Sequence, residues 1–288
     1  MAGAMRRLVR LVTVAALAIG SVAAGSVLVA PAAHAAAAAG TRAMWLWSRA
    51  DPAAVVSWAT GHGVREIFAY VAPDLAESGD LPRLAELKVR ADAAGIRLSA
   101  LGGDPDWILH PADALAWQRG ALGSGLFANS HVDAEPYLLA QWNTDQPATV
   151  AGYLALLDAL RADDPRPLEV DVPFWFGTIP APGGNLADQV LARVAAVTAM
   201  TYRDTATGPN SLTDVAADML ARGVAAGKPV RLAAETGPLA DCPHCTFFEE
   251  GEQHLVTTLE AVDAVESASA AFAGIAVHHY DSWLALAP

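Results

Sequence analysis

The sequence has few cysteines and few basic residues. Only two of its 288 residues are cysteine, which excludes a small scaffold held together by several disulfides. Lysine and arginine together number 18 against 31 acidic residues, so the formal net charge is −13. A chain this acidic is a poor partner for nucleic acid or an anionic membrane surface. We therefore expect neither as a partner, and a neutral or cationic substrate is compatible with the charge.

Long hydrophobic runs are lacking everywhere except near the N-terminus. Three arginines precede an apolar run over residues 11–30, and the small-residue stretch Ala33-His34-Ala35 follows it. This order is typical of a secretory signal peptide over residues 1–35, although the run is also long enough for an uncleaved membrane anchor. We expect a secreted protein with no membrane contact after cleavage, and a short linker over residues 36–41. Cleavage removes no acidic residue and makes the net charge −16.

Residues 42–288 alternate short strand-like runs with amphipathic helix-like runs. Pairs such as Asp51-Pro52 and Asn210-Ser211 indicate helix starts, and glycines such as Gly95 and Gly227 indicate helix ends. Eight such units in about 250 residues predict one α/β domain, a (β/α)8 barrel whose last helix is short or missing. The alternative, a doubly wound open sheet, normally has a glycine-rich turn after its first strand, and none is present. The expected strands cover residues 43–47, 66–71, 97–101, 127–135, 168–176, 195–202, 230–235 and 274–280.

Two acidic residues end the fourth expected strand, where a barrel places its active site. Asp133 and Glu135 are two residues apart and therefore face the same side of the strand. Like charges this close oppose joint ionisation, so one carboxyl keeps its proton near neutral pH, as acid–base hydrolysis of a glycosidic bond requires. We expect Glu135 to be the general acid and Asp133 to orient and tune it. The structural alternatives are a carboxylate that caps a helix or pairs with arginine, and a buried Asp bonded to backbone.

Other polar residues follow the sixth, seventh and eighth strands. Glu235 would lie across the barrel mouth from Glu135, either as the nucleophile of a retaining mechanism or as a substrate-binding residue. Substrate-binding roles are also expected for Tyr202, Asp204, His279 and Tyr280. The alternative for each is a structural residue satisfied by a neighbouring loop.

Several tryptophans fall at expected strand ends or in the loops that follow. Aromatic faces stack on the apolar patches of sugar rings, so these residues favour a saccharide cleft, although each alone is compatible with the core. We expect Trp47, Trp107 and Trp175 to bind substrate, and Trp142 and Trp283 share the same kind of location.

The two cysteines form a C-x-x-C motif, Cys242-Pro243-His244-Cys245. Thioredoxin-like oxidants use such a motif, but only at a helix start in a different fold. A zinc site with His244 and His254 would have a spacing unlike common sites. In an exported protein we expect a disulfide between Cys242 and Cys245, and no metal.

The strand ends resemble two groups of barrel glycosidases. Asp133-x-Glu135 and Met200-x-Tyr202 resemble the strand-4 and strand-6 signatures of family 18 glycoside hydrolases, the chitinase-like barrels. The resemblance implies that Glu135 is the acid, Asp133 its supporting carboxylate and Tyr202 a stabiliser of a substrate-assisted intermediate. Ala128 and His131 stand where that signature has Asp.

The second resemblance is to the clan with catalytic glutamates on strands 4 and 7. Ala134-Glu135-Pro136 is similar to its Asn-Glu-Pro segment, and Glu235-Thr236-Gly237 to its nucleophile segment, with Ala134 in place of the Asn that would bind the sugar 2-hydroxyl. This resemblance implies that Glu235 is the nucleophile.

We therefore expect a secreted, monomeric barrel hydrolase that cleaves a glycosidic bond without a cofactor. One alternative is a saccharide-binding barrel that has lost catalysis, for which the departures at Ala128, His131 and Ala134 are typical. Another is a metal-dependent hydrolase, but the first strand lacks the His-x-His pair common in such barrels. That alternative would use Asp104, Asp106, Asp133, Glu135 and His279.

Overall fold

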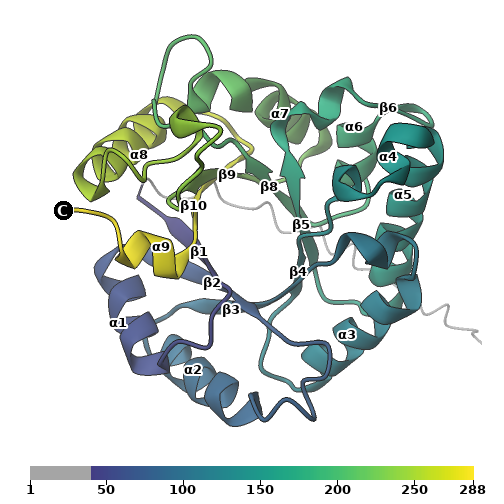
Figure 1. Ribbon diagram of the computed structural model, residues 1–288, viewed down its shortest axis with the longest axis horizontal. Coiled ribbons are helices and arrows are strands. Elements are labelled where there is room, and N and C mark those ends of the chain that lie inside the picture. Colours follow the sequence, from purple (N-terminus) through teal and green to yellow (C-terminus); the bar gives the residue numbers. More distant parts are fainter. Residues whose placement is uncertain (1–39) are drawn as a thin grey trace, which may run out of the picture. The chain divides into compact units, whose positions relative to one another are not determined.

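The computed structural model describes residues 40–288, which form the barrel drawn in colour in Figure 1. The predicted signal peptide over residues 1–35 lies outside the described residues. Within residues 40–288, no helix has the length and apolar character needed to cross a membrane.

Eight parallel strands close into a barrel, which confirms the predicted fold. Their order around the barrel is β1-β10-β9-β8-β5-β4-β3-β2, and β2 pairs with β1 to close it. Each expected strand overlaps one of them, although β4 is much shorter than predicted. The strands are β1 (Arg42–Leu46), β2 (Val64–Tyr70), β3 (Arg97–Gly102), β4 (Ser130–Val132), β5 (Leu168–Pro173), β8 (Ala196–Met200), β9 (Val230–Glu235) and β10 (Phe272–His278).

Helices surround the barrel as an outer ring (Figure 1). A two-residue antiparallel pair, β6 (Pro180–Ala181) and β7 (Gly184–Asn185), lies outside the barrel and was not predicted. The α-helices are α1 (Pro52–Gly61), α2 (Leu81–Ala93), α3 (Pro111–Gly123), α4 (Gln141–Thr144), α5 (Gln146–Asp163), α6 (Leu186–Leu191), α7 (Leu212–Ala226), α8 (Glu252–Glu266) and α9 (Tyr280–Leu284). The 3-10 turns are η1 (Pro105–Ile108), η2 (Pro136–Leu138), η3 (Phe174–Thr178) and η4 (Pro243–Cys245).

The predicted capping residues explain where several helices begin and end. The Asp51 side chain accepts a hydrogen bond from the Ala54 amide at 2.9 Å, and Ser211 caps α7 in the same way. Gly227 ends α7 with a φ of +63°, a conformation that favours glycine. The last helix, α9, has only five residues, as expected.

Two hydrophobic layers hold the barrel. The larger one lies between the outward-facing strand residues and the helices, and the smaller one lies inside the barrel. Along β5, Val170 and Val172 belong to the outer layer, whereas Glu169 and Asp171 alternate with them and are also buried. Because side chains alternate along a strand, both acids face the barrel interior.

Charged residues fill the N-terminal end of the barrel interior. Arg231 donates to Glu169 and to Glu66, each at 2.6 Å, and Arg97 donates to Glu66 at the same distance. All four side chains belong to the first three residues of their strands, at the end of the barrel opposite the one where barrel enzymes have their active sites. This network is therefore structural.

Candidate active site

Asp133 and Glu135 lie just beyond β4, at the C-terminal end of the barrel, as predicted. The Asp133 amide donates to the Gly102 carbonyl at 2.9 Å, which continues the strand pairing past Val132. A Cβ atom on Gly103 would lie 2.1 Å from the Asp133 carbonyl oxygen, so this close approach requires glycine. The hydrogen bond from Asp133 to the last residue of β3 and the close contact with Gly103 thus fix the Asp133 backbone.

The Asp133 carboxyl is favoured in its protonated form. Its Oδ1 atom is buried and has no hydrogen-bond partner among the described residues. Burial raises the pKa of Asp133 well above its usual value, and the negative charges of Asp171 and Glu135 raise it further, while His131 opposes them. Asp133 therefore holds a proton far more readily than an exposed Asp does.

Glu135 is half-buried beside it. Burial raises its pKa, a hydrogen bond from the Tyr137 hydroxyl to Oε1 partly offsets this, and the charge of Asp171 raises it again. A carboxyl with a raised pKa at the end of a barrel strand has the properties of a general acid.

Asp171 and His131 form a buried ion pair under these two acids. His131 Nε2 lies 2.8 Å from Asp171 Oδ1, and the Trp45 indole donates to Asp171 Oδ2 at 3.1 Å. Burial lowers the pKa of His131, but the carboxylates of Asp171 and Glu169 raise it to about 9, which favours the charged imidazole at neutral pH. Its Nδ1 is buried 3.9 Å from Glu169 and has no hydrogen-bond partner among the described residues. Neither residue was among the predicted site residues, although His131 was noted as a departure from the chitinase-like signature.

Glu235 is fixed by three hydrogen-bond donors at the end of β9. Oε1 accepts from the backbone amides of Thr236 at 2.8 Å and Gly237 at 2.6 Å, and Oε2 lies 2.7 Å from His278 Nδ1. The Trp47 indole donates to His278 Nε2 at 3.1 Å. Since an indole N–H is only a donor, that nitrogen accepts, and Nδ1–H therefore donates to Glu235. His278 is a site residue that the sequence analysis missed; it pairs with Glu235 in the register of β9 and β10.

Tyr202 lies where the charges of these acids converge. Its ring centroid is 6.2 Å from that of His278. Burial raises the pKa of Tyr202, and Glu235 contributes most among the acids, followed by Asp133, Asp171 and Glu135. The hydroxyl is therefore a neutral donor within electrostatic reach of all four carboxyls.

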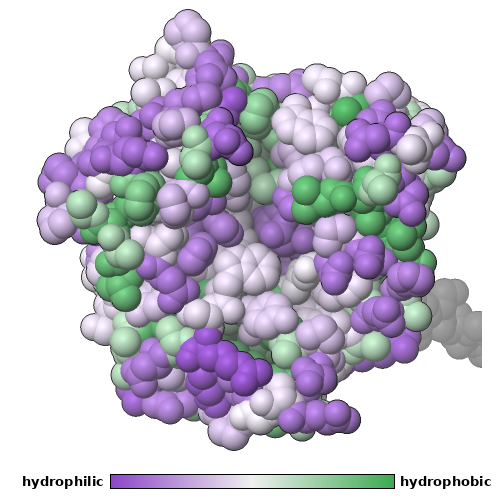
Figure 2. All heavy atoms as spheres, viewed as in Figure 1, coloured by the Kyte–Doolittle hydropathy of each residue, from purple (hydrophilic) through white to green (hydrophobic). Residues whose placement is uncertain are grey.

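Aromatic side chains lie on two sides of this group. Trp47 is half-buried, with its ring centroid 5.8 Å from that of Tyr70. Trp175 is also half-buried, and it packs 5.4 Å from Tyr137 and 6.2 Å from Trp142. Both predicted tryptophans are thus partly exposed and linked to a residue that hydrogen-bonds at the site. Viewed along the barrel, the centre of the face is white and purple, while green hydrophobic atoms gather toward its periphery (Figure 2).

Two of the expected substrate-binding residues are core residues instead. Trp107 is 6% exposed and packs against Trp117 with ring centroids 5.1 Å apart. Tyr280 is 4% exposed because it begins α9 and faces the core. Trp283, on the same helix, is buried against Trp58. These residues lie at or after strand ends, as expected, but neighbouring elements cover their side chains.

The remaining predicted residues lie at the edge of the group. His279 precedes α9, its Nδ1 lies 3.6 Å from Asp281, and burial lowers its pKa. Asp204 is partly buried, and its backbone amide donates to the His244 carbonyl at 3.2 Å. The structure thus joins Asp204 to the cysteine loop.

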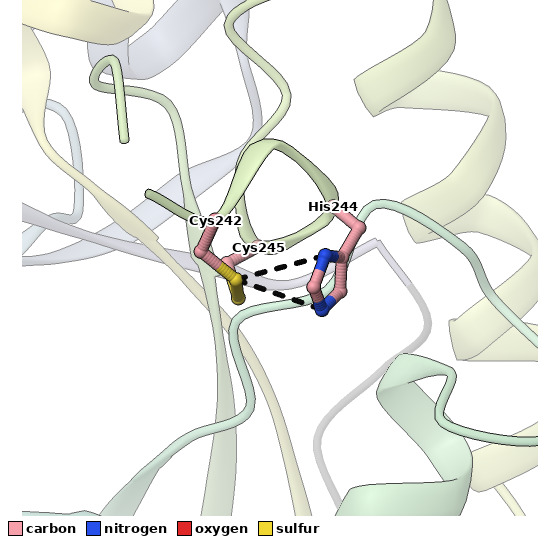
Figure 3. A group of neighbouring side chains, drawn as sticks. All are labelled: Cys242, His244 and Cys245. Carbon is pink, nitrogen blue, oxygen red and sulfur yellow. Dashed lines mark hydrogen bonds between the residues drawn. A yellow bond between two sulfur atoms is a disulfide. The ribbon is translucent and has the colours of Figure 1, made fainter. Parts of the chain in front are cut away.

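The predicted disulfide between Cys242 and Cys245 is present. Figure 3 shows the His244 ring facing the sulfur of Cys242, whose Sγ lies 3.6 Å from Nε2. These three residues are the group with metal-ligand spacing found within residues 40–288, but its two sulfurs are bonded to each other and are not free thiolates. The acids and the histidine of the metal-hydrolase alternative do not form such a group in that part of the chain.

Comparison with known proteins places the fold but not the family. No protein-family model matches the chain, and no curated protein matches it. Among solved structures, it is similar to a GH113 β-1,4-mannanase (TM-score 0.55, 10% identity, covering 85% of this chain and 88% of that one). It is also similar to a GH18 chitinase from Cycas revoluta in complex with (GlcNAc)3 (TM-score 0.55, 14% identity, 84% and 95%). A chitinase from Chromobacterium violaceum gives a TM-score of 0.53 at 12% identity, covering 86% and 97%. The chain therefore has the (β/α)8 barrel fold of these glycoside hydrolases.

Proposed function

We propose that this protein is a secreted glycoside hydrolase in which Glu135 donates the proton to the departing sugar oxygen. The observation that carries the proposal is the half-buried Glu135 carboxyl with a raised pKa, placed beside the buried Asp133 carboxyl at the C-terminal end of β4. The partly exposed Trp47 and Trp175 support a saccharide ligand.

The surroundings of Glu235 favour a substrate-assisted reaction over a glutamate nucleophile. Both Glu235 oxygens already accept hydrogen bonds, so the carboxylate is oriented toward its donors. In the proposed reaction, the acetamido oxygen of the substrate attacks the anomeric carbon and the glycosidic C–O bond breaks as Glu135 protonates the leaving oxygen. Asp133 orients Glu135, and the neutral Tyr202 hydroxyl donates to the acetamido group. Water then opens the cyclic intermediate, with Glu135 accepting its proton.

The test is turnover of oligosaccharides by the mature chain and by a Glu135→Gln variant. We expect wild-type hydrolysis of oligomers that carry N-acetyl groups and a loss of about 10²–10⁴-fold in kcat for the variant. Glu260→Gln on the exposed side of α8 removes the same charge far from the site and should leave turnover unchanged. Undiminished hydrolysis by Glu135→Gln would contradict the proposal.

The same panel distinguishes the other readings. Hydrolysis of acetylated oligomers alone supports the substrate-assisted reaction, whereas equal hydrolysis of mannan or glucan oligomers would point to Glu235 as a nucleophile. Binding by the wild type without turnover would identify a saccharide-binding barrel.

A further inference from the structure

Asp171 has an environment that differs from those of the two acids above it. Both of its oxygens accept hydrogen bonds, one from His131 Nε2 at 2.8 Å and one from the Trp45 indole at 3.1 Å. It is 3% exposed, so these donors stand in place of water. A charge-assisted hydrogen bond to one oxygen and a second donor to the other stabilise a buried carboxylate.

The strand register places this fixed charge next to the acids at the mouth. His131 pairs with Glu169 between β4 and β5, so two residues further along each strand Asp133 and Asp171 become neighbours that face the barrel interior. Asp133 Oδ1 is buried without a partner beside it. One carboxyl of this pair is therefore fully bonded as an anion, and the other lacks the bonds that an anion needs.

We propose that Asp171 is a positioning residue that keeps the proton on the Asp133–Glu135 pair. It does so because its negative charge, fixed by His131 and Trp45, disfavours ionisation of both acids. The proposal deepens the function proposed above and rests on it for its catalytic meaning. His131 stands where the chitinase-like signature has an Asp, and here it bonds Asp171.

The other charged groups around Asp171 do not reverse this effect. Glu169 lies on the same strand, but it is bonded to Arg231 and Arg97 at the opposite end of the barrel. Among residues 40–288, His131 is the cation that forms an ion pair with Asp171. His131 lowers the pKa of Asp133 by less than Asp171 raises it. Titratable groups that also feel the Asp171 charge are Asp133, Glu135, Tyr137, Tyr153, Tyr202 and Arg231.

The first test uses the unaltered mature chain and needs no substrate. In ¹⁵N-labelled protein at pH 7, we expect both ring nitrogens of His131 to show imidazolium chemical shifts, since Asp171 and Glu169 hold the pKa of His131 at about 9. A neutral His131 at pH 7 would leave Asp171 without its counter-charge and would overturn the proposal.

The second test is a ¹³C titration of the Glu135 carboxyl in wild type and in Asp171→Asn, with the signal assigned through Glu135→Gln. Removing the nearby negative charge should lower the Glu135 midpoint by about 1 pH unit. Glu260→Gln, which removes an equal charge from the outer surface of α8, should leave it unchanged. An unshifted Glu135 midpoint in folded Asp171→Asn contradicts the proposal.

A third test, the pH dependence of activity, distinguishes failure of this proposal from failure of the proposed function. If wild type hydrolyses its substrate, the alkaline limb of the kcat/KM profile should move to lower pH in Asp171→Asn by the shift seen in the titration. A shifted titration without wild-type turnover would reject the proposed function while leaving the charge arrangement intact. Turnover with an unshifted limb would reject the role of Asp171 alone.

Discussion

The two ends of the barrel interior treat buried carboxylates in opposite ways. At the N-terminal end, Glu169 is paired with Arg231 and Arg97; burial by itself raises its pKa, but these cations lower it far below the usual value. At the C-terminal end, Asp133 and Glu135 form no ion pair with an arginine of residues 40–288, and burial raises the pKa of each. The difference shows that burial alone does not decide the charge of an acid: burial raises the pKa at both ends, and the cations supplied by neighbouring strands reverse the shift at one of them.

The acids paired with arginine and the acids with raised pKa lie only two strand positions apart. Glu169 and Asp171 are two residues apart on β5, and His131 lies between the two ends, 2.8 Å from Asp171 and 3.9 Å from Glu169. The structural network thus ends where the candidate site begins.

The largest expected effect comes from breaking the N-terminal network. Arg231→Met removes the buried guanidinium that bonds both Glu66 and Glu169, and leaves these two acids only the more exposed Arg97 as a cationic partner among residues 40–288. It should cost about 3–5 kcal/mol of unfolding free energy. Urea unfolding measures this. Arg90→Gln, which removes an exposed ion pair with Glu86 on α2, should cost less than about 0.5 kcal/mol. Equal losses for the two variants would show that the buried network contributes no more to stability than an exposed ion pair does.

A second prediction concerns pH and the same network. Because the pKa of Glu169 is lowered in the folded state, its carboxylate contributes stability above its usual pKa of 4.5, and this is lost as the pH falls through the folded value. Glu169→Gln should therefore lose about 2–3 kcal/mol at pH 7 and progressively less below pH 4, as measured by urea unfolding at each pH. A loss that is equal at pH 3 and pH 7 would mean that packing, and not charge, is responsible.

Asp133 is expected to show the opposite sign. Since its pKa is raised in the folded state, ionising it costs stability that grows as the pH rises above 3.8. Asp133→Asn should therefore be more stable than wild type at pH 8, by roughly 1 kcal/mol for each pH unit of the raised pKa, and similar to wild type near pH 3.5. Destabilisation at pH 8 would remove the contrast between the two ends.

The smallest expected effect concerns the hydrogen bond from Tyr137 to Glu135. Tyr137→Phe removes the hydroxyl that bonds Oε1 and stabilises the ionised form, so the Glu135 midpoint should rise, by less than about 1 pH unit. A ¹³C titration measures this, and the alkaline limb of activity should follow. A fall of the midpoint would show that Tyr137 instead stabilises the protonated acid.

Much of the frame was predictable from local patterns. Strand-like runs separated by capped helices predicted the barrel, because capping residues such as Asp51 and Ser211 and terminal glycines such as Gly227 act within a few residues of themselves. The rule that barrel chemistry lies at strand ends then placed Asp133, Glu135 and Glu235 correctly at the C-terminal end.

The errors arose where a contact depends on distant residues. His278, the last residue of β10, bonds Glu235, and it was not among the predicted site residues because the contact depends on the register of β9 and β10. Trp107 is covered by Trp117 of α3, which no local pattern reveals. His131 departs from a known signature in the sequence, yet in the barrel it is the cation that bonds Asp171.

The sequence by itself determined the order of strands and helices and the end of the barrel at which the acids lie, because both follow from short-range patterns and strand alternation. Only the tertiary structure decided which acids are charged. That outcome depends on whether another strand supplies an arginine, a histidine, a tryptophan or no donor. His131 and Asp171, for example, bond although they are 40 positions apart in the sequence. Buried charge is set by partners at a few ångströms, and the closed barrel alone brings those partners together.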